Sequence, residues 1–352
     1  MRTPADGGHR SELGGRVLYR QLGSTDIMMP EIGFGCGNTA GLMIWGEPQD
    51  RLRAAQQAME LGINYFDTAA TYGAGKSEEN LGPVLAQLST RPLVGSKVAL
   101  QADELDDIAG GIRKSVERSL QRLGLEYLDV VHLHNRVTSH RAPGEVLAIG
   151  PLLTVDEMLG PNGVQETFEA LQREGKLRYF GFCAFGGDVE AYNQVVDEGR
   201  FHSLLVFYNV LNPTSGRAMP KEFAQHDYGQ VIDRAASKGI GTVALRVLEA
   251  GALSGSATPH DLNRGGPSAE PEYAQHARRA LTLDFMRRGA SETLPQMAIR
   301  FALQKSGVST VLVGFSEQAQ IPEAAACSGG EGFSAEQMGR LEELYRNDFG
   351  LA

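Results

Sequence analysis

The stretch Leu-Asp-Val-Val-His-Leu-His, residues 128–134, is a short hydrophobic run that ends in a polar side chain. Before it, apolar residues recur every three or four positions from Leu105 to Leu123, and Gly124 follows. That spacing predicts an amphipathic helix that ends at the glycine. Residues 105–134 therefore predict a helix that leads into a buried strand, which is the repeating unit of α/β proteins.

Seven more hydrophobic runs of this kind lie along the chain, and most of them are followed by a helical pattern. Their nearly continuous hydrophobicity is typical of parallel strands that are covered on both faces. These further predicted strands are 32–36, 64–68, 93–98, 179–184, 204–209, 242–247 and 310–315. Eight alternating units predict a closed (β/α)8 TIM barrel, and an open doubly wound sheet is the alternative.

The segments outside these units complete the predicted layout. Residues 18–22 and 27–29 flank Gly-Ser-Thr-Asp and predict an N-terminal hairpin at the bottom of the barrel. Residues 1–17 are rich in glycine and charge and predict a disordered tail, so that 18–352 forms a single barrel domain. Long connections follow three strands, at 136–163, 212–227 and 249–280. In a barrel they lie on the C-terminal face, where barrel active sites are found.

Composition limits the partners that the protein can have. The formal net charge of −10 at pH 7 argues against nucleic acid or an anionic membrane, because phosphate binding needs clustered Lys and Arg. No apolar stretch approaches the roughly 18 to 20 residues that cross a bilayer. The three cysteines, Cys36, Cys183 and Cys327, are too few and too dispersed for a disulfide framework. We expect a cytoplasmic protein with reduced thiols.

Four polar residues lie at or just beyond the ends of three consecutive predicted strands: Asp67, Tyr72, Lys97 and His134. In a barrel they converge at one mouth. Tyrosine has an unperturbed pKa of about 10, and a neighbouring ammonium lowers it by favouring the phenolate. A carboxylate holds the lysine charged, and a histidine can orient a substrate oxygen. This set suits a carbonyl that receives a hydride from a cofactor. A buried Asp–Lys salt bridge beside a hydrogen-bonded histidine is the purely structural alternative.

Motifs around these residues resemble those of one enzyme family. They are Tyr-Arg-Gln-Leu-Gly-Ser-Thr (19–25), Phe-Asp-Thr-Ala-Ala-Thr-Tyr-Gly (66–73), Ser-Glu-Glu-Asn-Leu-Gly (77–82), Ser-Lys-Val (96–98), Leu-Asp-Val-Val-His-Leu-His (128–134), Gly-Lys-Leu-Arg-Tyr-Phe-Gly-Phe (175–182) and Val-Leu-Val-Gly-Phe-Ser (311–316). In this order they closely resemble the aldo-keto reductases, over nearly the whole chain after the tail.

The resemblance implies a barrel without a Rossmann domain and a catalytic tetrad at Asp67, Tyr72, Lys97 and His134, with Tyr72 as general acid/base. It implies hydride transfer between NADPH or NADH and an aldehyde or ketone, or the reverse from an alcohol or sugar hemiacetal. It further suggests a monomer or a small homo-oligomer.

Three departures from the family pattern concern the nicotinamide. Cys183-Ala184 replaces the usual Ser-Asn, Leu205 stands at a usual glutamine, and residues 245–248 lack the usual stacking aromatic. These departures favour the sugar-dehydrogenase branches, where this region also deviates.

The segment 314–323 should meet the adenosine end of the cofactor, and it contains no Lys or Arg to pair with a 2′-phosphate. A carboxylate such as Glu317 accepts hydrogen bonds from a ribose diol and repels a phosphate. We therefore expect a preference for NAD(H), or use of both cofactors. The alternative is that the Glu317 side chain points into solvent and does not affect the cofactor preference. The candidate cofactor contacts are Gly35, Asp67, Cys183, Asn209, Arg246, Leu248, Gly314, Ser316, Glu317, Gln320 and Glu323.

Candidates for contact with a small carbonyl, alcohol or sugar substrate are Trp45, Tyr72, His134 and His140, with Arg141 beside His140. Trp45 follows the first strand and can close over a sugar, or it can be ordinary packing.

Rival interpretations rest on short motifs. Gly33-Phe-Gly-Cys-Gly37 lacks the last glycine of a dinucleotide fingerprint, and 70–77 ends like a phosphate-binding loop but contains Tyr72. His132 and His134 have the spacing of metal ligands, which suggests a metal-dependent barrel hydrolase, but no further ligands stand where that class needs them. We expect no metal site. A non-catalytic cofactor-binding subunit is the third alternative.

Overall fold

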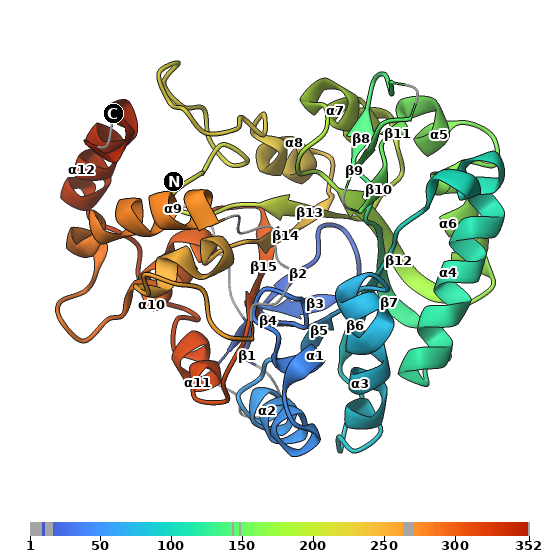
Figure 1. Cartoon of the computed structure of the whole chain (residues 1–352), viewed down its shortest axis with the longest axis horizontal. Coiled ribbons are helices and arrows are strands. Elements are labelled where there is room, and N and C mark those ends of the chain that lie inside the picture. The colour runs from blue at the N-terminus through green and yellow to red at the C-terminus, as the bar shows by residue number, and fades with distance from the viewer. Residues whose placement is uncertain (1–8, 11–16, 143, 148, 263–269, 351–352) are drawn as a thin grey trace.

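The computed structural model describes residues 9–10, 17–142, 144–147, 149–262 and 270–350 (Figure 1). Of the predicted tail, residues 1–17, it describes only His9, Arg10 and Val17. The division of the chain into a tail and one barrel domain therefore stays a prediction.

Eight parallel strands close into a barrel with helices around it (Figure 1). The strands are β4 (Ile32–Gly35), β5 (Tyr65–Asp67), β6 (Leu93–Val98), β7 (Leu128–Leu133), β12 (Leu177–Cys183), β13 (Ser203–Phe207), β14 (Gly241–Leu245) and β15 (Val308–Gly314). Each pairs with the next, and β15 closes the barrel on β4 with Gly314 opposite Gly35. The (β/α)8 prediction is confirmed, since every predicted strand overlaps an observed one, and the open sheet is wrong.

The helices cover the outside of the barrel. They are α1 (Leu42–Trp45), α2 (Pro48–Glu60), α3 (Lys76–Leu85), α4 (Ile108–Leu123), α5 (Val155–Leu159), α6 (Val164–Arg173), α7 (Val189–Glu198), α8 (Val231–Ser237), α9 (Glu270–Leu281), α10 (Leu294–Leu303), α11 (Gln320–Ala325) and α12 (Ala335–Arg346). Helix α4 ends as its sequence predicts, because Gly124 adopts a left-handed φ of 65° at its C-cap. Ser334 and Gln337 form the predicted capping box of α12.

A three-stranded antiparallel sheet of β1 (His9–Arg10), β2 (Leu18–Gln21) and β3 (Met28–Pro30) precedes the barrel. Strands β2 and β3 form the predicted hairpin. Its turn needs a glycine, because Gly23 has φ 55° and a Cβ there would lie 2.3 Å from the carbonyl oxygen of Gly239, just before β14. Ile27 and Met29 of the hairpin join one hydrophobic cluster with side chains of the strands. The hairpin therefore closes the N-terminal end of the barrel.

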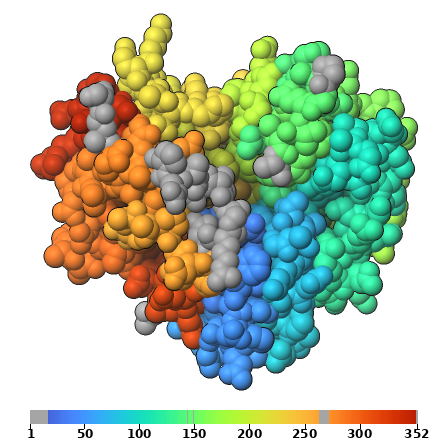
Figure 2. All heavy atoms as spheres, in the orientation of Figure 1, coloured from blue at the N-terminus to red at the C-terminus, as the bar shows by residue number. Residues whose placement is uncertain are grey.

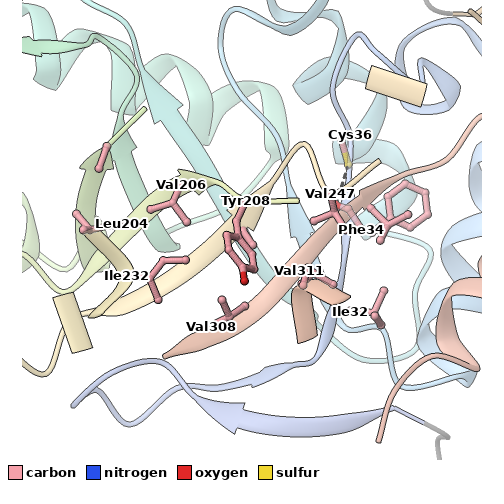
Figure 3. Packing of buried hydrophobic residues seen from close by; sticks show 14 of the residues in the cluster. Ile32, Phe34, Cys36, Leu204, Val206, Tyr208, Ile232, Val247, Val308 and Val311 are labelled. Atoms are coloured by element: carbon pink, nitrogen blue, oxygen red, sulfur yellow. Dashed lines mark hydrogen bonds between the residues drawn. The ribbon is translucent and has the colours of Figure 1, made fainter. Parts of the chain in front are cut away.

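Side chains on the outer face of the strands pack beneath the helices. Figure 3 shows Phe34 of β4, Val206 of β13 and Val311 of β15 in this layer, with Ile232 of α8 on the side of Val206. All four are fully buried. Because side chains alternate along a strand, the intervening residues point into the barrel, where the site is built.

The long connections carry short elements of their own. Residues 136–163 contain α5 and four two-residue strands, β8 (Val137–Thr138), β9 (Val146–Leu147), β10 (Gly150–Pro151) and β11 (Leu153–Thr154). The other short elements are the 3-10 helices η1 (Tyr72–Gly75), η2 (Ala102–Asp107), η3 (Glu249–Ser254), η4 (Asp284–Met286) and η5 (Asp348–Gly350). In Figure 2 the green segment near residue 140 and the yellow segment near 220 rise on either side of a hollow. Among the described residues, no helix has the length and apolar character to cross a membrane.

Candidate active site

The four residues singled out from the sequence come from three neighbouring strands. Asp67 is the last residue of β5, Lys97 is the penultimate residue of β6, and His134 follows β7 directly. Tyr72 opens η1, in the connection after β5. Because these strands are parallel and adjacent, their ends place the four residues at one mouth of the barrel.

Asp67 and Lys97 form a buried ion pair. Lys97 Nζ donates to Asp67 Oδ1 and, at 2.7 Å, to the carbonyl oxygen of Thr68. Burial raises the pKa of Asp67, and the charge of Lys97 opposes that rise. Burial alone would lower the pKa of Lys97, but the charge of Asp67 raises it above its ordinary value. The amine therefore carries its charge at neutral pH.

Tyr65, which the sequence analysis missed, holds the second oxygen of Asp67. Its hydroxyl donates to Asp67 Oδ2 at 3.1 Å, fully buried inside the barrel. Gly95 of the neighbouring β6 leaves the space for that hydroxyl, since a Cβ there would lie 2.3 Å from the Tyr65 oxygen. The sequence did contain an indication of this contact, because Tyr65 and Asp67 are two positions apart in one strand and their side chains therefore lie on the same face.

We expect Gly95→Ala to destabilise the protein by about 1–3 kcal/mol, because the new methyl group overlaps the Tyr65 hydroxyl. Tyr65→Phe removes the hydroxyl oxygen that the new methyl group would overlap, so the double variant should recover part of the lost free energy of unfolding. Urea unfolding of the wild type, both single variants and the double variant measures the coupling. Gly339→Ala in α12, where a Cβ meets nothing within 4 Å, is the control. Additive effects of the two substitutions would contradict this packing.

The Tyr72 ring lies beneath the lysine amine and against the histidine. Lys97 Nζ is 4.7 Å from the ring centroid, and the ring of His134 meets it edge-on at 5.9 Å. Burial raises the pKa of the Tyr72 phenol, the charge of Lys97 lowers it, and that of Asp67 raises it again. The net shift is upward. The prediction of a lowered pKa is therefore wrong, although the effect of the lysine itself has the predicted sign.

His134 is a neutral imidazole. Burial, followed by the positive charges of Lys97 and Arg136, lowers its pKa to about 3. Its Nδ1 lies 3.2 Å from the hydroxyl oxygen of Thr71, another residue that the sequence analysis missed. Thr71 directly precedes Tyr72, so the same short segment supplies the phenol and orients the imidazole.

His132 contacts a side chain of the barrel wall. It is buried below His134, with Nε2 3.0 Å from the Ser203 hydroxyl oxygen, and burial holds its pKa well below the ordinary value. The described part of the chain has no group of three or more His, Cys, Asp or Glu side chains placed to hold a metal ion.

The candidate cofactor residues in or just after β12, β13 and β14 differ in burial, charge and hydrogen-bond partners. Cys183 is buried near the ion pair, and burial raises the pKa of its thiol, so it is a small neutral group. The Asn209 amide donates to the Arg246 carbonyl oxygen at 2.9 Å and to Glu249 Oε2 at 2.5 Å, so it is occupied within the loop. Arg246, at φ 53°, is partly exposed and pairs with Glu249 at 3.1 Å. Leu248 is partly buried.

The remaining candidate cofactor residues gather where β15 meets β4. Gly35 and Gly314 lie opposite each other at the ends of these strands. After β15, Gln320 Oε1 accepts from the backbone N–H of Ser316 at 2.9 Å and of Glu317 at 3.3 Å. Glu317 Oε1 lies 3.4 Å from His260 Nε2, and the Glu317 side chain is 64% exposed. Glu323, in the first turn of α11, is also exposed.

The predicted substrate residues lie in two places, around the Tyr72 segment and on the long connection after β7. Trp45 lies next to the Tyr72 segment, with Lys76 Nζ 4.9 Å from its ring centroid. His140 is exposed on the long connection after β7. Arg141 pairs through both terminal nitrogens with Glu157, at 2.8 and 2.9 Å, and therefore stabilises that connection. Trp45, Tyr72, His134 and His140 remain candidates for substrate contact.

A (β/α)8 barrel with a phenol, a paired lysine and a neutral imidazole at its C-terminal mouth defines a barrel oxidoreductase. Comparisons with known proteins agree. The sequence profile of the aldo/keto reductase family matches residues 31–346. The chain belongs to this family, whose members use NAD(H) or NADP(H).

Individual relatives are distant. The chain is 27% identical to L-galactose dehydrogenase of Arabidopsis thaliana over 322 residues, covering 88% of each chain. It is 26% identical to L-glyceraldehyde 3-phosphate reductase of Escherichia coli K12 over 357 residues, covering 94% of this chain and 92% of the relative. Its fold is similar to that of an aldo-keto reductase from Bacillus halodurans in its holo form, with a TM-score of 0.67, 21% identity and coverage of 93% and 95%.

Proposed function

We propose that the protein transfers a hydride between a nicotinamide cofactor and an aldehyde or ketone, or the corresponding alcohol or sugar hemiacetal, with Tyr72 as general acid/base. The observation that carries the proposal is the Lys97 amine, paired with Asp67 and held above the Tyr72 ring. The relatives named for a galactose and for a glyceraldehyde phosphate support a sugar-like substrate.

The residues at the mouth suit proton transfer to a carbonyl oxygen. A phenol with a raised pKa is protonated at neutral pH and can donate to an oxygen on which negative charge develops. The charge of Lys97 stabilises the phenolate left behind. The neutral His134 can hydrogen-bond the same oxygen and set its direction. In the reverse direction, the phenolate takes the proton of the alcohol.

The residues also fit a nicotinamide cofactor, which supplies the hydride when bound. Arg246 is a partly exposed cation at the end of β14 that can face a pyrophosphate. Residues 314–323 carry no Lys or Arg to pair with a 2′-phosphate, which supports NAD(H). Cys183 and Ala184 are buried and carry no amide, so another group must hold the carboxamide.

Titration with NADH, NADPH, NAD and NADP by fluorescence, followed by turnover of aldoses and aryl aldehydes, tests the proposal. We expect micromolar binding of a nicotinamide, with NAD(H) preferred, and cofactor-dependent turnover. Absence of nicotinamide binding would reopen the metal-hydrolase and non-catalytic alternatives. Much tighter binding of NADPH than of NADH would leave hydride transfer standing and remove the role of Glu317.

A further inference from the structure

An arginine beside the candidate active site has no hydrogen-bond or ion-pair partner among the described residues. Arg136 lies two residues after His134 and is partly buried. Its Nε is buried without a hydrogen-bond partner. Among the described residues, none forms an ion pair or hydrogen bond with its guanidinium. The fully buried arginines elsewhere are paired, Arg279 with Asp348 and Arg300 with Glu292.

Two glycines leave space in the backbone next to the Arg136 side chain. A Cβ on Gly186 would lie 3.0 Å from Arg136 Cζ and Nε, so the glycine lets the guanidinium approach the backbone closely. Gly186 and Gly187 have φ of 67° and 76°, which also favour glycine. Gly186 follows β12 and Arg136 follows β7, two strands that pair directly. The guanidinium is therefore held between the C-terminal ends of β7 and β12, at the mouth that carries His134.

Other polar side chains lie near enough to Arg136 to feel its charge. The charge of Arg136 contributes to the pKa of His134, Cys183 and Tyr228, so these side chains lie within its electrostatic reach. Tyr228 packs edge-on against Phe207, the last residue of β13, with ring centroids 6.1 Å apart. Its hydroxyl makes no hydrogen bond within the described residues. No acidic side chain among the described residues pairs with Arg136. The carboxylate whose charge reaches Tyr228 is that of Glu249, which is paired with Arg246 at 3.1 Å.

We propose that Arg136, assisted by the Tyr228 hydroxyl, binds an anionic oxygen group of the substrate, a carboxylate or a phosphate. A partly buried charge without a partner is unfavourable, and a ligand anion removes that penalty. The planar guanidinium matches carboxylate and phosphate oxygens in a two-pronged hydrogen bond. The inference rests on the proposed function for the identity of the reacting carbon, and it narrows the substrate class to acidic or phosphorylated carbonyl compounds and their alcohols.

Binding without turnover tests the inference directly. Isothermal titration of the protein with sn-glycerol 3-phosphate, with succinate and with neutral glycerol compares the wild type with Arg136→Gln. We expect one of the two anions to lose at least about tenfold in affinity in Arg136→Gln, as for a lost charge-assisted hydrogen bond. If sn-glycerol 3-phosphate loses affinity, Arg136 binds a phosphate group; if succinate loses affinity, it binds a carboxylate. Arg173→Gln, which removes one exposed charge at the end of α6, should bind as the wild type does.

Turnover separates this inference from the proposed function. For glyceraldehyde 3-phosphate against glyceraldehyde, or succinic semialdehyde against butanal, the ratio of kcat/KM should fall about 10- to 100-fold in Arg136→Gln. Equal anion affinity in the wild type and Arg136→Gln, or an equal loss for all substrates together with weaker nicotinamide binding, would overturn the inference. If no nicotinamide binds, the proposed function fails, and the titrations with anions still decide the role of Arg136.

Discussion

Replacing Tyr72 by phenylalanine is expected to lower kcat by about 10²- to 10⁴-fold, because general acid–base catalysis contributes that much. The substitution removes one hydroxyl and leaves the ring beneath Lys97 and against Gly37, where a Cβ would touch the ring at 3.4 Å. Nicotinamide affinity should therefore stay within a few fold of the wild type. Steady-state turnover and a fluorescence titration of the cofactor measure the two quantities separately.

Tyr127→Phe is the matched control for this variant. The Tyr127 ring packs under the guanidinium of Arg91 at 4.2 Å, just before β7 and hence at the opposite end of the barrel. It loses the same hydroxyl without touching the site, and we expect wild-type turnover. Near-normal turnover of Tyr72→Phe would contradict its assignment as the acid/base, whatever the cofactor affinity.

The raised pKa of Tyr72 connects this result to the direction of the reaction. Burial and Asp67 together outweigh the influence of Lys97, so the free protein holds a protonated phenol at neutral pH. A proton donor is what reduction of a carbonyl requires, whereas oxidation of an alcohol requires the phenolate. On the proposed mechanism, raising the pH should therefore favour oxidation relative to reduction.

The fold was accessible from sequence because each strand is a short apolar run closed by turn residues. The barrel follows from their number and from the helices between them. Strand ends were less well defined, as at β12, which begins two residues before the prediction at Leu177. There Arg178 and Tyr179 interrupt the apolar pattern, while backbone pairing with β7 continues.

The sequence predicted which residues form the candidate site, but it did not predict their burial or their pKa shifts. Asp67, Tyr72, Lys97 and His134 could be found because polar groups at the ends of apolar strands are difficult to explain by packing. The net pKa shifts depend on burial, which a linear pattern does not contain. Arg136 was missed because its surroundings come from residues such as Gly186, fifty positions away in the chain and adjacent only once β7 and β12 pair.

Replacing Lys97 by methionine is expected to destabilise the protein by about 3–5 kcal/mol, because it leaves the Asp67 charge buried without a partner. Among the described side chains, Asp67 would retain only the hydroxyl of Tyr65 as a partner. Urea unfolding at fixed pH measures the loss. Lys305→Met is a control, since its partner Asp233 is 54% exposed and can be solvated when the lysine is removed.

The loss in Lys97→Met should also depend on pH, with a sign that identifies its cause. Burial already raises the pKa of Asp67 in the folded protein, and removing the opposing lysine raises it further. A carboxyl whose folded pKa lies above its unfolded value contributes stability below the unfolded pKa, about 4, and that contribution is lost as pH rises through the folded pKa. The deficit should therefore be larger at pH 8 than at pH 5. Adding Asp67→Asn removes the buried charge, so the double variant should regain most of the stability, lose the pH dependence and remain without activity. A double variant as unstable as Lys97→Met would show that the lysine stabilises the barrel by packing, and that charge pairing with Asp67 is secondary.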